Sequence, residues 1–160
     1  MHLQRGQWDP SLFHCRTFAE YVITSNLAFQ TPDPDGLQFA LISSSMFITW
    51  QKTIGGRLKS DLRFASTLTW YTFPVPELEE EIRHRIIEAG KKVLAARELH
   101  PERSLADQYN PFAMDPELIK AHDGLDREVD RAMGSPRKLT SDRQRQDILF
   151  ANYARMTRRT

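Results

Sequence analysis

The chain has 160 residues and a formal net charge of +1, with 40% hydrophobic and 27% charged residues. This length suits one compact domain or two small ones, and the composition is that of a globular protein rather than a disordered or collagen-like one. The near-neutral total charge gives no general indication of a polyanionic partner. Since no apolar run approaches the roughly 18 residues that a membrane span needs, we expect no membrane partner.

The N-terminal stretch MHLQRGQWDPSLFHC lacks the basic region, apolar segment and cleavage site of a secretory signal, which predicts a cytoplasmic protein. A single cysteine, Cys15, excludes an internal disulfide and a zinc site of the common CxxC kind. Charge is unevenly distributed. From residue 137 onward the sequence has seven lysines and arginines but only two acidic residues, Asp142 and Asp147. Acidic residues are concentrated in PELEEE, residues 76–81.

Residues 21–29, YVITSNLAF, are β-branched and aromatic and predict one or two short strands, followed by a loop in QTPDPDG. Residues 37–54 have the length and apolar spacing of a helix, although their β-branched content also allows a strand. We expect this helix to end at Gly55–Gly56, where glycine can close the last turn in a left-handed conformation. Residues 64–73, FASTLTWYTF, predict a strand that the next prolines end.

After Pro76 the apolar residues follow steps of three and four, which predicts a helix that buries Leu78, Ile82, Ile86, Ala89, Val93 and Ala96. Four glutamates open this segment, at positions 77, 79, 80 and 81. Acidic side chains suit the positive end of a helix dipole, and this interpretation is favoured over a metal or catalytic role.

Ser104 is predicted to cap one short helical turn within a connector. Asp115 and Pro116 have the residue types of an N-cap and a first helical position, and Gly134 is expected to end that helix. The helix is predicted to bury Leu118, His122, Leu125, Val129 and Met133, and a last helix from about Thr140 to bury Leu149, Tyr153 and Met156. We therefore predict an α+β fold class: a strand-containing part, residues 1–76, followed by a bundle of about three helices, residues 77–160.

No catalytic constellation is visible. The histidines show no metal-ligand spacing, and the nucleophile-elbow, Walker and GxGxxG motifs are all absent. His122 lies on an apolar stripe and is interpreted as a core histidine. YNPF, residues 109–112, has part of the Asn-Pro-Pro-aromatic loop of amino-group DNA methyltransferases but lacks the second proline, so we interpret it as a turn. The sequence predicts no catalytic, cofactor-binding or metal-binding residue.

A cluster of cations follows the two glycines in GGRLKSDLRFAS, residues 55–66. On a short irregular segment its guanidinium, ammonium, hydroxyl and backbone N–H groups could together hold phosphates. The candidate residues are Arg57, Lys59, Ser60, Arg63 and Ser66. An ordinary solvated loop, partly neutralised by Asp61, is the alternative interpretation.

The run from Phe39 to Leu78 resembles the end of the target-recognition domain in large type II bifunctional restriction–modification DNA methyltransferases, the MmeI-like group. The matching positions are Trp50, Gly56, Arg57, Leu58, Lys59, Asp61, Arg63, Phe64, Ser66, Phe73, Pro74, Pro76 and Glu77. A second stretch, SLADQYNPFAMDPELIKAHDGLDREVDRAMG, is similar to the C-terminal helical region of that group. Together the two resemblances cover approximately residues 20–158.

The resemblance implies the DNA-binding and C-terminal helical portion of an adenine-N6 DNA methyltransferase that uses S-adenosylmethionine. The cofactor turn and the catalytic loop are missing from this chain, so we expect it to be non-catalytic by itself and to bind no cofactor. Its expected partners are double-stranded DNA, through the five residues of the cation cluster, and the catalytic domain of the longer enzyme. The alternative is a structural helical module that docks on that domain or mediates self-association as a homo-oligomer.

Overall fold

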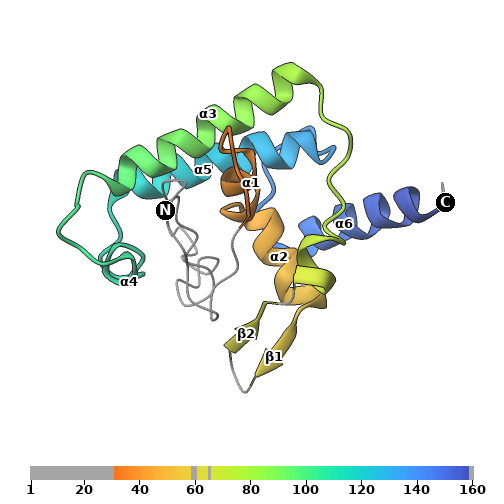
Figure 1. Cartoon of the computed structure of the whole chain (residues 1–160), viewed down its shortest axis with the longest axis horizontal. Helices are drawn as coiled ribbons and strands as arrows, with labels where there is room; N and C mark the ends of the chain where they lie inside the picture. Colours follow the sequence, from red (N-terminus) through yellow and green to blue (C-terminus); the bar gives the residue numbers. More distant parts are fainter. Residues whose placement is uncertain (1–30, 59–60, 65, 159–160) are drawn as a thin grey trace.

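The computed structural model describes residues 31–58, 61–64 and 66–158, and within these residues the chain is almost entirely helical (Figure 1). The described elements are α1 (Leu37–Ile42), α2 (Ser45–Ile54), β1 (Gly56–Leu58), β2 (Asp61–Arg63), the π-helix η1 (Ser66–Trp70), α3 (Glu80–Arg97), α4 (Leu105–Gln108), α5 (Pro116–Ala132) and α6 (Asp142–Thr157).

The predicted α+β fold class is wrong for this part of the chain. Its only strands are the two three-residue arms of one antiparallel hairpin, which form no layer against the helices. The strands predicted within residues 21–29 lie outside the described residues. The physical reason is that β-branched and aromatic residues suit any half-buried surface, and here helices supply the partners for that surface.

The single helix predicted for residues 37–54 is two helices, broken at Ser43 and Ser44. The Ser44 hydroxyl donates to the carbonyl oxygen of Leu41 at 2.6 Å and accepts from the backbone N–H of Phe47 at 3.3 Å, so it caps α2. Serine competes for backbone hydrogen bonds in this way, which a search for apolar periodicity does not detect. The expected left-handed glycine is also wrong, because Gly55 is extended with a φ of −67°.

The strand predicted for residues 64–73 is wrong as well. Residues 66–70 form η1, and Trp70 ends it with a backbone carbonyl that accepts from the N–H of Phe73 at 3.2 Å. Phe64, Trp70 and Phe73 surround the Phe47 ring, with centroid distances of 6.5, 5.8 and 5.1 Å. Packing around one ring on α2 therefore replaces pairing with a neighbouring strand.

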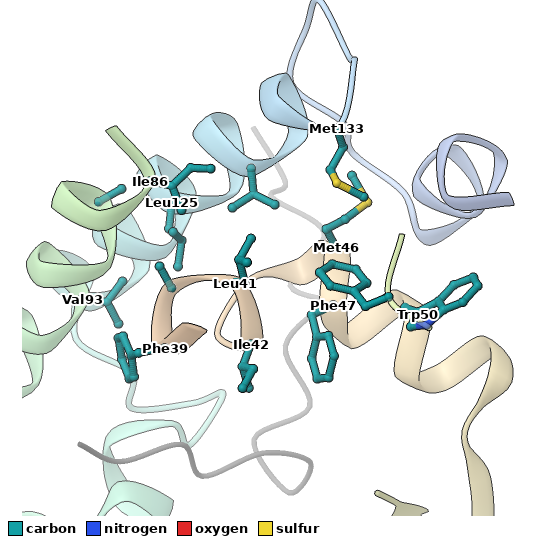
Figure 2. Close-up of a cluster of buried hydrophobic side chains, with 14 of the residues drawn as sticks. Phe39, Leu41, Ile42, Met46, Phe47, Trp50, Ile86, Val93, Leu125 and Met133 are labelled. Atoms are coloured by element: carbon teal, nitrogen blue, oxygen red, sulfur yellow. The ribbon is translucent and has the colours of Figure 1, made fainter. Parts of the chain in front are cut away.

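A single hydrophobic core joins the two halves of the described chain, as Figure 2 shows for its central side chains. The long helices α3 and α5 pack along one another, α1 lies across α3, and α2 lies against α5 and α6. α1 comes close to α3 at Gly90, where an added Cβ would lie 2.7 Å from the Cβ of Ala40. Glycine is therefore needed at that crossing to let α1 reach α3.

Most predictions for the C-terminal helices are confirmed. Ser104 and Asp115 cap α4 and α5 through side-chain hydrogen bonds to the N–H groups of Asp107 and Glu117. Gly134 follows α5 with a φ of +103°, the conformation that favours glycine. The residues predicted to be buried on α5 are all buried, as are those from Ile86 to Ala96 on α3, while Leu78 and Ile82 pack against the core only in part.

The last helix differs from its prediction. Leu149 is buried as expected, but Tyr153 and Met156 are about two-fifths exposed. The polar residues Arg145 and Asn152 occupy the buried face instead. Hydrophobicity did not identify this face because α6 turns its charged and amide groups inward, toward α5. Among the described residues no helix is both long and apolar enough to span a membrane.

Candidate nucleic-acid interface

The predicted cation cluster lies on the β1–β2 hairpin, which projects from the end of α2 on the side away from α3 (Figure 1). The strands pair Gly56 with Arg63, Arg57 with Leu62, and Leu58 with Asp61. A paired ladder thus replaces the irregular segment that we expected. It brings the backbones of Arg57 and Arg63 onto one hairpin but places the two residues on different rungs.

Of the other three candidate residues, the structure describes only Ser66. Lys59 and Ser60 lie between the two strands, outside the described residues. Ser66 is the first residue of η1, directly after the hairpin. Four of the five candidates therefore belong to the hairpin or its turn by sequence, and the fifth begins the segment that returns the chain to the core.

The helix from which the hairpin projects, α2, shares a base of aromatic side chains with α6. Trp50 is buried, donates from Nε1 to the hydroxyl of Thr72 at 3.3 Å, and contacts the rings of Phe150 and Tyr153 on α6 with centroids 5.9 and 5.8 Å away. Figure 2 shows Phe47 and Trp50 on α2 among the other side chains of the core. The base therefore joins α2, the segment after η1, and α6.

A buried charge cluster joins α2, α5 and α6, and it was not predicted from the sequence. Arg145 binds Asp130 through two hydrogen bonds of 3.1 Å and lies 3.9 Å from Asp126. Asp126 also accepts hydrogen bonds from the backbone N–H and the hydroxyl of Ser45, at 2.7 and 2.5 Å. The cluster connects the first turn of α2 to α5 and α6.

Two carboxylates share one guanidinium in this cluster, so they cannot both be fully compensated. Burial, opposed mainly by Arg145, raises the pKa of Asp126 to about 6. Burial also raises the pKa of Asp130, again against the attraction of Arg145. The available sequence signal was the i, i+4 spacing of the two aspartates beside Leu125 and Val129 on the apolar stripe of α5.

His122 is a core histidine, as predicted. Arg97 donates from Nε and Nη2 to the hydroxyl oxygen of Tyr109, at 2.8 and 2.6 Å, so the Tyr109 O–H is left to donate to Nε2 of His122 at 2.7 Å. Burial, and then the positive charge of Arg97, lower the pKa of His122 to about 3. The imidazole is neutral at physiological pH, and its role is structural.

Of two further interpretations, the turn in residues 109–112 is confirmed and the placement of the four glutamates is confirmed in part. The YNPF segment is a turn in which the Asn110 side chain accepts from the N–H of Phe112 at 3.0 Å. Glu80 and Glu81 occupy the first turn of α3 and Glu79 is its N-cap, but Glu77 precedes the helix, which begins three residues later than expected. No set of three or more acidic, histidine or cysteine side chains within the described ranges is arranged to hold a metal ion.

Comparison with known proteins identifies this arrangement. The family model described as "MmeI, target recognition domain" matches residues 12–77, and the one described as "MmeI, C-terminal domain" matches residues 78–160. The chain belongs to the MmeI family. It comprises regions of the target-recognition and C-terminal domains of that family, so the hairpin falls within the target-recognition region and α3 to α6 within the C-terminal one.

Two relatives of the family agree. A protein named DNA methyltransferase A from Bacillus subtilis (strain 168) is 38% identical over 137 residues, which is 86% of this chain and 15% of that protein. The structure of the Type IIL restriction-modification enzyme MmeI in complex with DNA matches with a TM-score of 0.74 and 38% identity, over 79% of this chain and 17% of that one. The chain therefore spans about one sixth of the length of either relative.

Proposed function

We propose that this chain is the part of an MmeI-type DNA methyltransferase that holds double-stranded DNA, with the β1–β2 hairpin as the contact. The observation that carries the proposal is the position of Arg57 and Arg63 on a projecting hairpin in the region matched by the target-recognition domain. The related MmeI structure is a complex with DNA, which supports this partner. Arg57, Lys59, Ser60, Arg63 and Ser66 are the proposed contact residues, because guanidinium, ammonium and hydroxyl groups bind phosphate oxygens.

The longer enzyme is proposed to be a cytoplasmic adenine-N6 methyltransferase. S-adenosylmethionine would supply its methyl group, and a separate catalytic domain would bind that cofactor, because this sequence has no glycine-rich turn suited to it. We keep residues 1–76 and 77–160 as the proposed division between target recognition and helical support. The two parts would act as one body, since both contribute side chains to the same core.

The test is fluorescence anisotropy of the 160-residue chain with a labelled mixed-sequence duplex at several salt concentrations. For duplex DNA the slope of log affinity against log salt is about −0.9 per phosphate neutralised. Arg57→Ala and Arg63→Ala are each expected to weaken binding to all duplexes alike and to make the slope shallower by about 0.9.

The matched control is Arg127→Ala, which removes the same charge from the exposed face of α5. It is expected to leave the slope unchanged. If Arg127→Ala and Arg57→Ala weaken binding equally, the hairpin is not the contact. No binding by the unmodified chain even at low salt would reject the proposal.

A second candidate function is docking on the catalytic domain of the longer enzyme. It is supported by exposed apolar side chains in a row on α6, namely Phe150, Tyr153 and Met156 with 48, 39 and 45% exposure. Tight association with a separately expressed catalytic half, weakened by Met156→Ser but not by Ile119→Ser, would support docking. Ile119 is a suitable control because it is equally exposed, at 46%, on α5. A chain that stays monomeric in light scattering and ignores the catalytic half would exclude this function.

A further inference from the structure

The helix that carries the hairpin is held near both ends by polar groups from far along the sequence. At its first turn, Ser45 donates two hydrogen bonds to Asp126 of α5. Midway along the helix, the hydroxyl of Thr49 donates to Asp142 of α6 at 3.3 Å, and in the last turn the Lys52 ammonium lies 3.6 Å from the same carboxylate. Gln146, one turn further along α6, donates from Nε2 to the hydroxyl of Thr53 at 2.9 Å.

Only one residue, Gly55, separates this helix from the hairpin. α2 ends at Ile54, Gly55 donates its N–H to the carbonyl oxygen of Gln51 at 2.9 Å, and β1 begins at Gly56. A Cβ on Gly55 would lie 2.3 Å from both the carbonyl oxygen and the side-chain amide nitrogen of Gln51, so the junction is closely packed. The direction of the hairpin therefore follows the direction of α2.

The contacts that Asp142 makes from α6 are poorly suited to stabilising the fold as a whole. The carboxylate of Asp142 is 38% exposed, and ion pairs at such positions contribute little to stability. Apolar packing holds α2 against the core but has no directional preference, whereas hydrogen bonds do. Asp142 and Gln146 act where the direction of α2 matters most, at the end from which the hairpin projects.

We propose that Asp142 and Gln146 are positioning residues for DNA binding: α6 fixes the angle at which the hairpin meets the duplex without touching the DNA. This inference rests on the proposed function of the hairpin. It gives the C-terminal helices a role in recognition that does not require them to contact a base or a phosphate. Loosening α6 from α2 would let the hairpin sample other directions. The apparent affinity for DNA then falls in proportion to the fraction of molecules whose hairpin keeps the direction that can bind.

The experiment compares Asp142→Ala/Gln146→Ala with Asp147→Ala in the 160-residue chain. Asp147 is a good control because it is exposed on the same helix and its removal changes the net charge by the same amount. Loss of a negative charge alone should strengthen DNA binding slightly in both variants. We expect the double variant instead to bind duplex DNA about threefold to tenfold more weakly than the control, as the competent fraction falls.

Two readouts separate positioning from a general structural role. The salt slope should stay that of the unmodified chain, because the same phosphates are neutralised once the hairpin is bound. Amide hydrogen exchange should become faster in residues 56–63 but not in α3 or α5. Thr53→Val, which removes one hydroxyl on the α2 side, should show the same pattern with a smaller loss of affinity, and it serves if the double variant does not fold.

The outcomes distinguish this inference from the proposed function. If the unmodified chain binds DNA but the double variant binds like Asp147→Ala, the positioning role is rejected and the hairpin remains the contact. A weaker double variant with a shallower salt slope would also reject it, because that result indicates a lost phosphate contact. If the unmodified chain binds no DNA, the proposed function fails, and unchanged hydrogen exchange in residues 56–63 would then reject the positioning role separately.

Discussion

The α3–α5 pair and the α2–α6 region are held together by different kinds of contact. Along α3 and α5 the buried side chains are mainly aliphatic and repeat at helical spacing, with Ile86, Val93, Leu125 and Val129 fully buried. Around α2, hydrogen bonds and ion pairs join residues 81 to 93 positions apart in sequence. A regular apolar stripe can be recognised in one helix alone, whereas a polar contact has meaning only when its distant partner is known.

The largest expected effect comes from removing the buried cation of the polar cluster. Arg145→Met should destabilise the chain by about 3–5 kcal/mol, because it leaves Asp126 and Asp130 buried without their cation. Urea unfolding followed by circular dichroism measures this. The control Arg143→Met, on an exposed position of the same helix, should cost less than about 0.5 kcal/mol. Equal stability of the two variants would show that the cluster contributes nothing.

Acid stability tests two buried groups of α5, His122 and Asp126, whose pKa values are shifted in opposite directions. The folded pKa of His122, about 3, is below its ordinary 6.5, so its contribution to stability falls as the pH drops from about 6.5 toward 3. The folded pKa of Asp126, about 6, is above its ordinary 3.8, so its contribution rises as the pH drops from about 6 toward 4. The two slopes oppose one another in the unmodified chain.

Removing one of these two groups should leave the pH dependence of stability that is due to the other. Asp126→Asn should steepen the loss of stability between pH 6 and 4, and His122→Gln should flatten it, each by up to roughly 1.4 kcal/mol per pH unit. Urea unfolding at several pH values between 4 and 7.5 gives the slopes. Exposed carboxylates contribute equally to all variants and cancel in the comparison. Parallel curves for the two variants would contradict the assigned directions.

Two glycines, one on α3 and one on α5, test the apolar packing of these helices. Gly90→Ala places a methyl group 2.7 Å from the Cβ of Ala40, where backbone must move, and should cost about 1–2 kcal/mol even though alanine favours helix. Gly124→Ala on α5 meets no atom within 4 Å and should stabilise by about 0.5–1 kcal/mol. Thermal unfolding compares them. A Gly90→Ala variant as stable as Gly124→Ala would mean that α1 does not cross α3 so closely.

The smallest effect compares two serine caps, Ser44 before α2 and Ser104 before α4. Ser44 is buried and binds both Leu41 and Phe47, so Ser44→Ala should cost about 1–2 kcal/mol. Ser104 is exposed and caps only the four-residue α4, so Ser104→Ala should cost about 0.5 kcal/mol. Denaturant midpoints of the two variants give the difference, and the reverse order would count against a structural break at Ser43–Ser44.

Sequence predictions succeeded where the determining interaction is local. The Asp115 cap, Pro116 and Gly134 act within a few residues of chain, so the bounds of α5 could be predicted almost completely. The same holds for the stripe of α3. The candidate site was predicted only as a cluster of residues, because the pairing of Arg57 with Leu62 and of Arg63 with Gly56 depends on how the hairpin folds.

The sequence by itself determined the helices of the C-terminal half, the core position of His122 and the composition of the cation cluster, since each depends on residue type and short-range spacing. Only the tertiary structure decided that residues 66–70 form a π-helix, that Arg145 faces the core while Tyr153 is partly exposed, and that α6 contacts the helix carrying the hairpin. These features depend on partners up to 93 residues away. Burial of a charge is favourable only beside a specific opposite charge, and no pattern within one helix specifies that neighbour.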